Sequence, residues 1–571
     1  MSSTTSEPGS TWAVDPGPTP DTGAARGEGG APGPAPAEAA ALAGVRFLRS
    51  FDGLEPSAEI LAAISERHAS GVTLFRARNV STPEQVRRLC AALQAARPAV
   101  DPPLVIGLDQ EGGQLQAVGD GATAWPGNLA LGATGSEELA CKAGRAIGAE
   151  VAALGGTLVY APVCDVLQRS SATPLGTRPF GDDPQQVSRL AAAMTAGLQE
   201  AGIAATLKHF PGHGSAAADS HKALPVVGHD LAELHECELP PFVAGISAGV
   251  RAVLPGHLAV PALTGGVEIP ATISRAILEG LLRDELGFRG VTVSDALDMA
   301  GAAHGGGLGG TVGAAADAGM DLLLLNHPAD VEEAAFESLR EAFESGAVDP
   351  TRAEAAHHRI MALRSQLAGI VQPSIDVVGC AEHRALAREI AEASVTLVRD
   401  PAGLVPLNVT ADGHVAVVAP APVDLTPAET SSYLQIGLAR ALRERGLAVD
   451  EFTMPLDPTP ADIAALEAAT AGHAITLVCT FDAVSFPGQA SLVSRLADAG
   501  AGAVVATGPG GARRVVAVAL RSPYDVALFP AAVASICTYG IQPPQIEALT
   551  DALLGRILFA GRLPVRLEKA R

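Results

Sequence analysis

Short apolar runs alternate with amphipathic stretches over residues 41–368. Apolar runs bounded by Gly, Pro or polar residues are typical of buried strands, whereas apolar positions that recur every three or four residues are typical of surface helices. The amphipathic stretches include Pro83–Ala96 and Ser136–Leu154. Eight strands that alternate with helices predict an α/β fold, a parallel (β/α)8 barrel of the TIM type. The expected strands are Gly44–Arg49, Val72–Phe75, Leu104–Leu108, Thr157–Ala161, Ala205–Lys208, Val253–Leu254, Val291–Val293 and Met320–Leu325.

The pattern changes from about residue 381. His383–Ala393 and Thr430–Arg445 are amphipathic and predict helices, and short apolar runs lie around them. This order of elements predicts a smaller, open α/β sandwich. The expected strands of this second part are Val395–Val398, Val415–Val418, Ile475–Cys479, Ala503–Ala506 and Ala527–Phe529.

These patterns divide the chain into four parts. We expect a disordered tail at 1–38, the barrel at 39–370, a linker and connecting helix at 371–390, and the second α/β domain at 391–571. The tail is rich in Ser, Thr, Gly, Pro and Ala, and it has neither the basic nor the apolar region of a signal peptide.

Charge and composition exclude several classes of function. The 571 residues carry a formal net charge of −23, which disfavours nucleic acid and anionic membranes as partners. No uncharged apolar run reaches the roughly 18 residues of a membrane span, so we expect a cytoplasmic protein. The seven cysteines are scattered without a C-x-x-C pair and are expected to be reduced thiols.

Polar residues follow the predicted barrel strands at the point where each strand ends. In parallel barrels the carboxyl ends of the strands carry the chemistry. The sequence therefore predicts a polar site at this end of the barrel. The residues in question are Asp109, Glu111, Asp165, Lys208, His209, His257, Asp295, Asn326 and His327.

The segment Thr206–Gly214 and the Asp219-Ser-His221 sequence after it carry the densest polar chemistry. Asp219 and His221 are two residues apart, so in an extended segment their side chains point the same way and can form a hydrogen bond. A carboxylate beside an imidazole fixes its tautomer and raises its basicity, as a general acid/base requires.

Two other interpretations of this segment remain open. His209 and His213, together with Asp219 and His221, could bind a metal ion, since His is the commonest transition-metal ligand. Pro and Gly lie between His209 and His213, however, so no helix presents the two rings on one face. The other interpretation is a polar loop with a purely structural role. We expect no metal and no organic cofactor.

The sequence motif Lys208-His-Phe-Pro-Gly-His-Gly214, followed by Asp219-Ser-His221, resembles that of the β-N-acetylglucosaminidase branch of glycoside hydrolase family 3. The resemblance implies that Asp219 and His221 form the acid/base dyad. It also implies that Asp295, in a Ser-Asp-x-Leu-x-Met motif, is the nucleophile that forms a glycosyl-enzyme. The alternative for Asp295 is a helix N-cap, and Asp298 is expected to be an ordinary helix residue.

The resemblance also implies substrate-binding residues. Asp109, in Asp109-Gln-Glu-Gly-Gly113, would receive sugar hydroxyls, and Arg178, Lys208 and His209 match further sugar-binding positions. The alternative for Arg178 is a surface arginine in a Pro- and Gly-rich loop.

The chain departs from the family motif where Gln114 and Ala117 replace two arginines. The loss of these basic groups weakens the case for an anionic muramyl sugar. Beyond the barrel, Ala393–Val398, Val405–Leu407 and Gly561–Arg566 resemble the family's second domain, so the resemblance covers nearly everything after the tail. Gly508–Gly511 lacks the spacing of a phosphate-binding loop and is interpreted as a turn.

The resulting hypothesis is a retaining exo-β-N-acetylglucosaminidase acting on small soluble sugars, without a cofactor, in carbohydrate metabolism such as peptidoglycan recycling. The first alternative is a glycoside phosphorylase that uses the same residues and takes inorganic phosphate as a second substrate. The second is an inactive sugar-binding or sensor protein, since the two missing arginines could mark lost activity. Glucose in place of N-acetylglucosamine also remains open.

Overall fold

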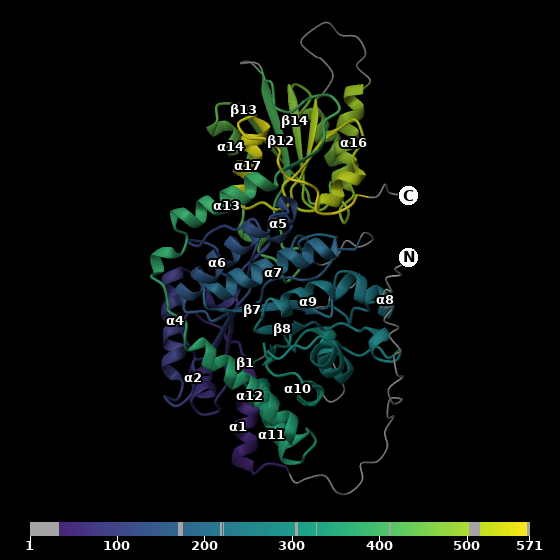
Figure 1. Cartoon of the computed structure of the whole chain (residues 1–571). Helices are drawn as coiled ribbons and strands as arrows, with labels where there is room; N and C mark the ends of the chain where they lie inside the picture. Colours follow the sequence, from purple (N-terminus) through teal and green to yellow (C-terminus); the bar gives the residue numbers. More distant parts are fainter. Residues whose placement is uncertain are drawn as a thin grey trace, which may run out of the picture.

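The computed structural model describes residues 33–168, 175–216, 220, 222–302, 307–326, 328–409, 413–501 and 514–567. The first part of the chain forms a barrel, and the second part forms an α/β domain stacked on one end of it (Figure 1). The two parts are joined by helix α13 (Ala381–Ser394), which packs against both.

The barrel contains all eight predicted strands, each paired in parallel with the next along the sheet. The sheet closes on itself, because a parallel bridge between Val293 and Leu322 joins its two edges. Several strands are shorter than their apolar runs, and the short stretches beyond them belong to the same buried core. The strands are β1 (Phe47–Arg49), β2 (Gly71–Leu74), β3 (Val105–Leu108), β6 (Leu158–Val159), β7 (Ala204–Phe210), β8 (Ala252–Pro255), β9 (Val291–Thr292) and β10 (Leu323–Leu324).

Helices surround the barrel, and the longer ones pack on it through an apolar stripe, as α4 shows. Helix α4 starts after the N-cap Thr82, has Pro83 at its first position and buries Val86, Leu89 and Leu93 on one face. The α- and π-helices of this part are α1 (Pro36–Gly44), α2 (Ala58–Ser65), α3 (Arg76–Asn79), α4 (Pro83–Ala96), α5 (Asn128–Thr134), α6 (Glu137–Leu154), α7 (Pro184–Glu200), α8 (Leu231–Glu233), the π-helix η1 (Leu234–Glu238), α9 (Pro240–Ser247), the π-helix η4 (Ala276–Glu285), α10 (Gly307–Ala318), α11 (Ala329–Glu344) and α12 (Pro350–Leu367).

The second domain is a three-layer sandwich around a six-stranded sheet, ordered β11-β16-β15-β14-β12-β13. All pairs are parallel except β11 with β16. Alternation along β12 sends Val415 and Val417 to a core with α14 and α17, and Val418 to a core with α15 and α16. The elements are β11 (Thr396–Arg399), β12 (His414–Pro420), α14 (Leu438–Glu444), β13 (Ala448–Met454), α15 (Pro460–Ala469), β14 (Ile475–Thr480), α16 (Gly488–Ala501), β15 (Val515–Ala519), β16 (Ala534–Cys537) and α17 (Pro543–Leu553).

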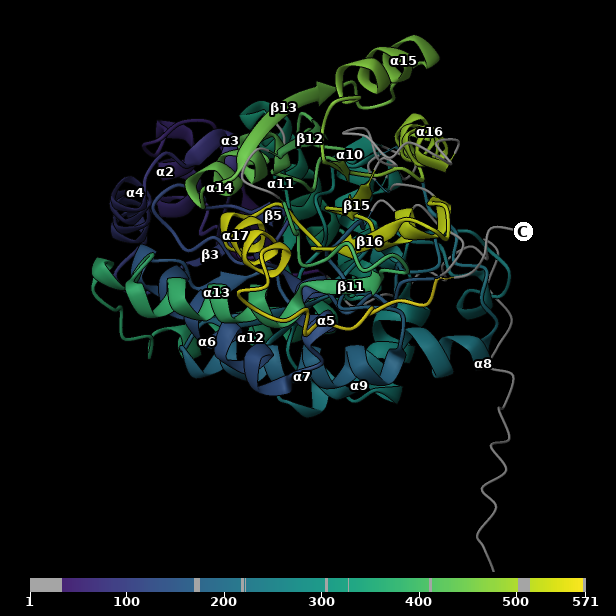
Figure 2. The ribbon, with the colours of Figure 1, turned by 90° about the horizontal axis from the view of Figure 1, so that it is seen from above.

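Helix α5 of the barrel completes the second domain. Leu129, Ala130 and Ala133 lie in the same buried cluster as side chains of β12, β14 and α16. Hydrogen bonds cross the same boundary, because the Gln542 side chain donates to the Gly113 carbonyl at 2.7 Å. Seen from above, the second domain lies over the barrel, with barrel helices such as α4, α6 and α9 around it (Figure 2). The two domains therefore share a core.

Some expected elements of the second domain are different in the structure. Ala527–Phe529 is not a strand but lies at the 3-10 helix η8 (Pro523–Leu528). Within Thr430–Arg445, the α-helix α14 begins only at Leu438. The run Ala503–Ala506 lies outside the described residues. Three strands were not predicted: β13, which carries exposed acidic residues on an edge, and β15 and β16.

The barrel begins before the boundary expected from composition. Helix α1 starts at Pro36 and buries Ala39, Leu42 and Ala43 in a cluster with α11, so the last residues of the expected tail at 1–38 belong to the folded domain. Residues 1–32 lie outside the described residues.

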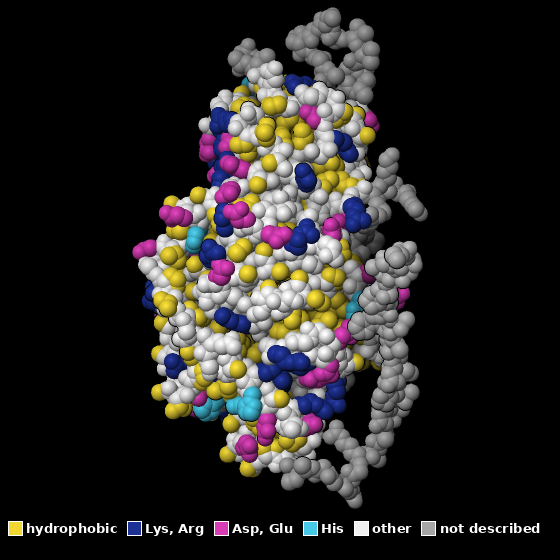
Figure 3. Space-filling view, in the orientation of Figure 1, with side chains coloured by type: hydrophobic (Ala, Val, Ile, Leu, Met, Phe, Trp, Pro, Cys, Tyr) yellow, Lys and Arg dark blue, Asp and Glu magenta, His cyan; other side chains and the backbone are white. Residues whose placement is uncertain are grey.

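The surface mixes charges of both signs. In Figure 3, basic and acidic side chains are interspersed over the face shown, without a large area of one sign. All seven cysteines are free thiols. Among the helices of the described residues, none combines the length and the apolarity that crossing a membrane requires.

Candidate active site

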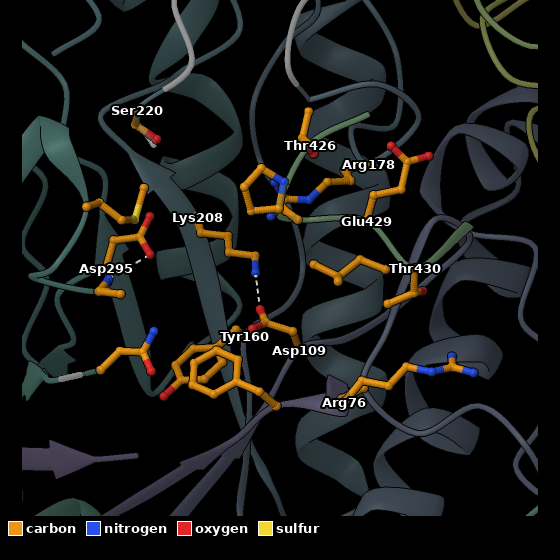
Figure 4. A pocket seen from close by; sticks show the side chains of 18 of the residues that line it. Arg76, Asp109, Tyr160, Arg178, Lys208, Ser220, Asp295, Thr426, Glu429 and Thr430 are labelled. Carbon is orange, nitrogen blue, oxygen red and sulfur yellow. Dashed lines mark hydrogen bonds and ion pairs between the residues drawn. The ribbon is translucent and has the colours of Figure 1, made fainter. Parts of the chain in front are cut away.

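A cavity of about 470 Å³ lies between the carboxyl end of the barrel strands and the second domain. Barrel residues at strand ends form its floor and one side, and residues 424–433 of the second domain form another side (Figure 4). Among the predicted site residues, the lining includes Asp109, Arg178, Lys208, His209 and Asp295. The barrel brings Asp109, Lys208, His209 and Asp295 together as predicted from their positions at strand ends, and Arg178, expected here only from the family resemblance, joins them from a loop.

Lys208 lies at the centre of a buried ionic network on the cavity floor. Its Nζ is 2.7 Å from Asp109 Oδ1 and 2.6 Å from Glu111 Oε1. Arg178 forms a two-pronged ion pair with Glu111, with N–O distances of 2.8 and 2.9 Å. The Asp109 side chain is 25% exposed, while those of Lys208 and Glu111 are almost completely buried. Asp109 therefore offers its carboxylate to the cavity, and Glu111 holds the cations beneath it.

The network fixes the charge states of its members. Burial alone would raise the pKa of Glu111, but Arg178 and Lys208 outweigh it and lower the pKa to about 2. Burial lowers the pKa of Lys208, but Asp109 and Glu111 outweigh it, so its pKa is raised. The site therefore presents the Asp109 carboxyl group beside a cationic Lys208, a pair that can accept from and donate to neighbouring sugar hydroxyls.

Asp165 orients the two histidines of the 206–214 segment. Its carboxylate is 2.7 Å from His209 Nδ1 and accepts a hydrogen bond from the backbone N–H of His213 at 2.7 Å. Burial raises the pKa of Asp165, but the two histidines outweigh it and lower the pKa overall. Since Nδ1 of His209 faces Asp165, its Nε2 lies toward Arg178, at 3.4 Å from Nη2.

Asp295 lies across the cavity from Asp109 (Figure 4). It follows β9, and its Oδ1 accepts a hydrogen bond from the Ala296 N–H at 2.9 Å. The buried His257 donates from Nε2 to the Ala296 carbonyl at 3.0 Å and accepts from Thr272 Oγ1 at 2.9 Å. His257 therefore holds the backbone directly after Asp295.

Tyr160 fills the floor near these carboxylates. It is buried, its hydroxyl is 2.6 Å from Thr73 Oγ1, and its ring centroid is 5.8 Å from Lys208 Nζ. A side chain at Gly107 would place its Cβ 2.6 Å from the Tyr160 hydroxyl, so this position needs glycine. Burial raises the pKa of Tyr160, and the neighbouring Asp109 and Asp295 raise it further, which keeps the phenol neutral.

Comparison with known proteins identifies the family. Residues 38–363 match the model of the glycosyl hydrolase family 3 N-terminal domain. The chain belongs to glycosyl hydrolase family 3. Since this match spans more than half of the chain and includes every barrel strand, the protein is a glycosidase with the family's α/β architecture.

Individual relatives agree with this family assignment. A β-hexosaminidase of Thiobacillus denitrificans is 40% identical over 277 residues, which are 47% of this chain and 75% of the relative. One of Pseudomonas aeruginosa is 40% identical over 278 residues, 48% of this chain and 81% of the relative. The solved structure of a family 3 β-N-acetylglucosaminidase from Paenibacillus sp. str. FPU-7 is 33% identical, with a TM-score of 0.83 over 93% of this chain and 99% of that one.

Two residues that the motif assigns to the active site, Asp219 and His221, have no described geometry. Asp219 and His221 lie outside the described residues, whereas Ser220 between them is described and lines the cavity. Their assignment as the dyad therefore stays a prediction from the motif. No group of three His, Cys, Asp or Glu side chains within the described residues is arranged to hold a metal ion.

Several alternatives from the sequence are wrong. Arg178 is no surface arginine, because it is buried against Glu111. Asp295 caps no helix, since a turn and the short 3-10 helix η5 (Ala300–Ala302) follow it. Asp298 lies in that turn, not in a helix, and it lines the cavity with its Oδ2 3.2 Å from Asn326 Nδ2.

The substitutions at Gln114 and Ala117 have different consequences. Ala117 lines the cavity directly. Gln114 is buried, and its Oε1 accepts hydrogen bonds from the backbone N–H and the hydroxyl of Thr177 at 2.8 and 3.0 Å. Gln114 therefore supports the loop that carries Arg178.

Sequence reasoning missed three contributors to the site. Glu111 was noted as polar after a strand, but its role as the shared partner of Arg178 and Lys208 was not predicted. Tyr160 lies inside an apolar run of the sequence, where only its hydroxyl distinguishes it. The wall formed by residues 424–433 was assigned to no site, because it comes from the other domain.

Proposed function

We propose that this family 3 glycosidase is a retaining exo-β-N-acetylglucosaminidase that removes terminal β-linked N-acetylglucosamine from small sugars. The observation that carries the proposal is the arrangement of Asp295 opposite the Asp109–Lys208 pair in one cavity. The cavity volume, about 470 Å³, lies within the usual range for small-molecule sites, roughly 300–1,000 Å³. The likeness to the Paenibacillus enzyme over nearly its full length supports the choice of sugar.

In the first step, Asp109, Lys208 and the Arg178–His209 pair orient the sugar through its hydroxyls, with the anomeric carbon over Asp295. A carboxylate oxygen of Asp295 forms a bond to the anomeric carbon, while the bond from that carbon to the leaving oxygen breaks. His221, oriented by Asp219, gives its proton to the leaving oxygen. Preorganised charges around the cavity lower the barrier because they need no rearrangement during the reaction.

In the second step, His221 takes a proton from water, and the water oxygen attacks the anomeric carbon from the face that the leaving group vacated. The bond to Asp295 breaks, and the sugar leaves with its β configuration retained. The carboxylate of Asp295 is restored, and His221 is protonated for the next cycle.

The test is turnover of 4-nitrophenyl β-glycosides of N-acetylglucosamine and of glucose, with the products followed by proton NMR. We expect the N-acetylglucosaminide to be preferred and the β-anomer of free sugar to appear first. Initial formation of the α-anomer would contradict the retaining mechanism, and a preference for the glucoside would contradict the substrate. The same reactions with increasing phosphate at constant ionic strength test for a phosphorylase, which would release sugar 1-phosphate.

A further inference from the structure

The segment between β12 and α14 brings the second domain into the site. We call residues 424–433 the domain-two loop. It contributes polar and small side chains to the cavity, on the side away from Asp295 (Figure 4). The residues that line the cavity are Asp424, Thr426, Pro427, Ala428, Glu429, Thr430 and Tyr433.

The domain-two loop is fixed to the barrel. The Thr430 N–H donates to the Gln114 carbonyl at 2.7 Å, and the Gln116 N–H donates to Thr430 Oγ1 at 3.3 Å. Tyr433 also lies under the Arg76 guanidinium, 4.2 Å from its ring centroid. These contacts join the C-terminal part of the domain-two loop, Thr430–Tyr433, to the barrel.

Glu429 fixes the loop from within its own domain. Its carboxylate is buried and receives hydrogen bonds from Arg521 at 3.1 and 3.2 Å, from Ser431 Oγ at 2.6 Å and from the Leu425 N–H at 3.1 Å. A buried carboxylate with this many donors is strongly oriented. The domain-two loop is therefore a rigid wall of the cavity.

The domain-two loop lies at the end of the cavity that would hold the C4 hydroxyl of the bound sugar. With the anomeric carbon over Asp295 and hydroxyls at Asp109 and Lys208, the ring extends from Asp295 toward the domain-two loop. In a pyranose the C4 hydroxyl lies opposite the anomeric carbon. The loop therefore faces the end of the sugar where a preceding sugar would be attached in a longer chain.

Thr426 carries an unused polar group at this wall. Its hydroxyl oxygen is buried and has no hydrogen-bond partner among the described residues. Burying a hydroxyl without a partner is unfavourable. Figure 4 shows Thr426 on the same side of the cavity as Arg178 and Glu429. A ligand hydroxyl at this end of the cavity would supply the missing partner.

We propose that the domain-two loop is the closed end of the sugar site, so that only a terminal sugar fits, and that Thr426 binds the hydroxyl at that end. The inference rests on the proposed orientation of the sugar. It assigns specificity, not chemistry, to the second domain.

The first experiment removes the Thr426 hydroxyl without changing the side-chain shape. Thr426→Val should lower kcat/KM for the preferred 4-nitrophenyl β-glycoside about 2- to 10-fold, the usual effect of one neutral hydrogen bond. The 4-deoxy analogue should show no difference between Thr426→Val and the wild type. Thr453→Val, at an exposed position of edge strand β13, is the matched control and should leave both substrates unaffected.

A Thr426→Val enzyme that matches Thr453→Val on both substrates would overturn the role of Thr426. An equal loss on the parent and 4-deoxy substrates would overturn it too, because the effect would then be independent of that hydroxyl. If the wild type prefers a β-glucoside, the proposed substrate is wrong, and the same comparison with 4-deoxyglucoside still tests the wall.

The second experiment opens the wall but keeps its anchors at Glu429 and Thr430. The wild type should reject a substrate whose C4 hydroxyl carries a methyl group. The measured quantity is kcat/KM for the methylated substrate divided by kcat/KM for the unmethylated one. This ratio should be at least several-fold higher in the triple variant Thr426→Gly, Pro427→Gly, Ala428→Gly than in the wild type. An unchanged ratio in a variant that remains folded and active, or a wild type that accepts the methylated substrate, would overturn the closed end.

Discussion

At the scale of single residues, the account depends on buried charges that only the folded barrel brings together. Glu111 forms ion pairs with both Arg178 and Lys208 while it is itself almost completely buried. Its pKa, about 2 in the folded protein against an ordinary value of 4.5, means that folding favours its ionised form. The stability from this ion pair is therefore full above pH 4.5 and is lost as the pH falls toward 2.

Glu111→Gln should lower the free energy of unfolding at neutral pH by about 3–5 kcal/mol, the cost of leaving buried charges without their partner. The difference from the wild type should shrink between pH 4.5 and 3, measured by urea unfolding. Turnover should also fall, since Lys208 and Arg178 lose their alignment. Glu138→Gln, which removes a surface ion pair with Lys142, is the control and should change little. A difference between Glu111→Gln and wild type that stays constant with pH would contradict the assignment.

For Glu238 we expect the opposite pH dependence of folding stability. Burial, and then the nearby Asp165, raise its pKa from 4.5 to about 8. Folding therefore favours the protonated form, so its contribution to stability is full below pH 4.5 and is lost as the pH rises toward 8. A glycine, Gly212, allows the carboxyl group to lie against the 206–214 segment, and His229 Nδ1 is 3.6 Å from it.

Glu238→Gln should therefore be more stable than the wild type at pH 9, by several kcal/mol as an order of magnitude from the shift in pKa. The two proteins should converge toward pH 4.5. Thermal melting across this pH range measures the effect. Glu236→Gln, at an exposed position of the same π-helix, is the matched control. Parallel melting profiles for Glu238→Gln and wild type would show that Glu238 is not held protonated.

At the scale of elements, the apolar pattern predicted the barrel strands because each is a buried run between helices. The predicted helix Thr430–Arg445 is wrong between Thr430 and Gly437, because the Thr430 N–H donates a hydrogen bond to the Gln114 carbonyl of the barrel. That partner is over three hundred residues away, so no local pattern indicates it. Strand β13 was missed for a related reason, because an edge strand with exposed acidic residues has little apolar alternation.

The Glu429–Arg521 pair supports the domain-two loop and gives an element-scale prediction. Glu429→Gln should lower the free energy of unfolding by about 3–5 kcal/mol, since the buried Arg521 would lose its nearest ion-pair partner. KM for the sugar substrate should rise more than kcat falls, because the loop touches the far end of the sugar. The double variant Glu429→Leu, Arg521→Met should recover part of the stability. A Glu429→Gln protein with wild-type stability and KM would contradict a structural role for the pair.

At the scale of the whole molecule, the sequence predicted two α/β domains and the site residues at the barrel's strand ends. It did not predict that both domains enclose one cavity, because that depends on how α5 and α13 dock the second domain. Apolar side chains of α5 look the same in sequence whether they pack within one domain or between two.

The start of the folded unit gives a prediction at this scale. Removing residues 1–32 should leave the melting temperature and turnover unchanged, as the composition of that segment implies. Removing residues 1–44 deletes α1, whose Leu42 is buried with α11, and should lower the melting temperature by several degrees. Differential scanning calorimetry distinguishes the two truncations. Equal melting temperatures for all three proteins would contradict the packing role of α1.

The central claim is that Asp295 forms a covalent bond to the sugar. The most direct measurement is incubation with 5-fluoro-N-acetylglucosaminyl fluoride, followed by protease digestion and mass spectrometry of the peptides. The account predicts one labelled peptide with the sugar on Asp295, and no label in Asp295→Asn. A label on another carboxylate, or turnover of the reagent without any covalent adduct in the wild type, would contradict it.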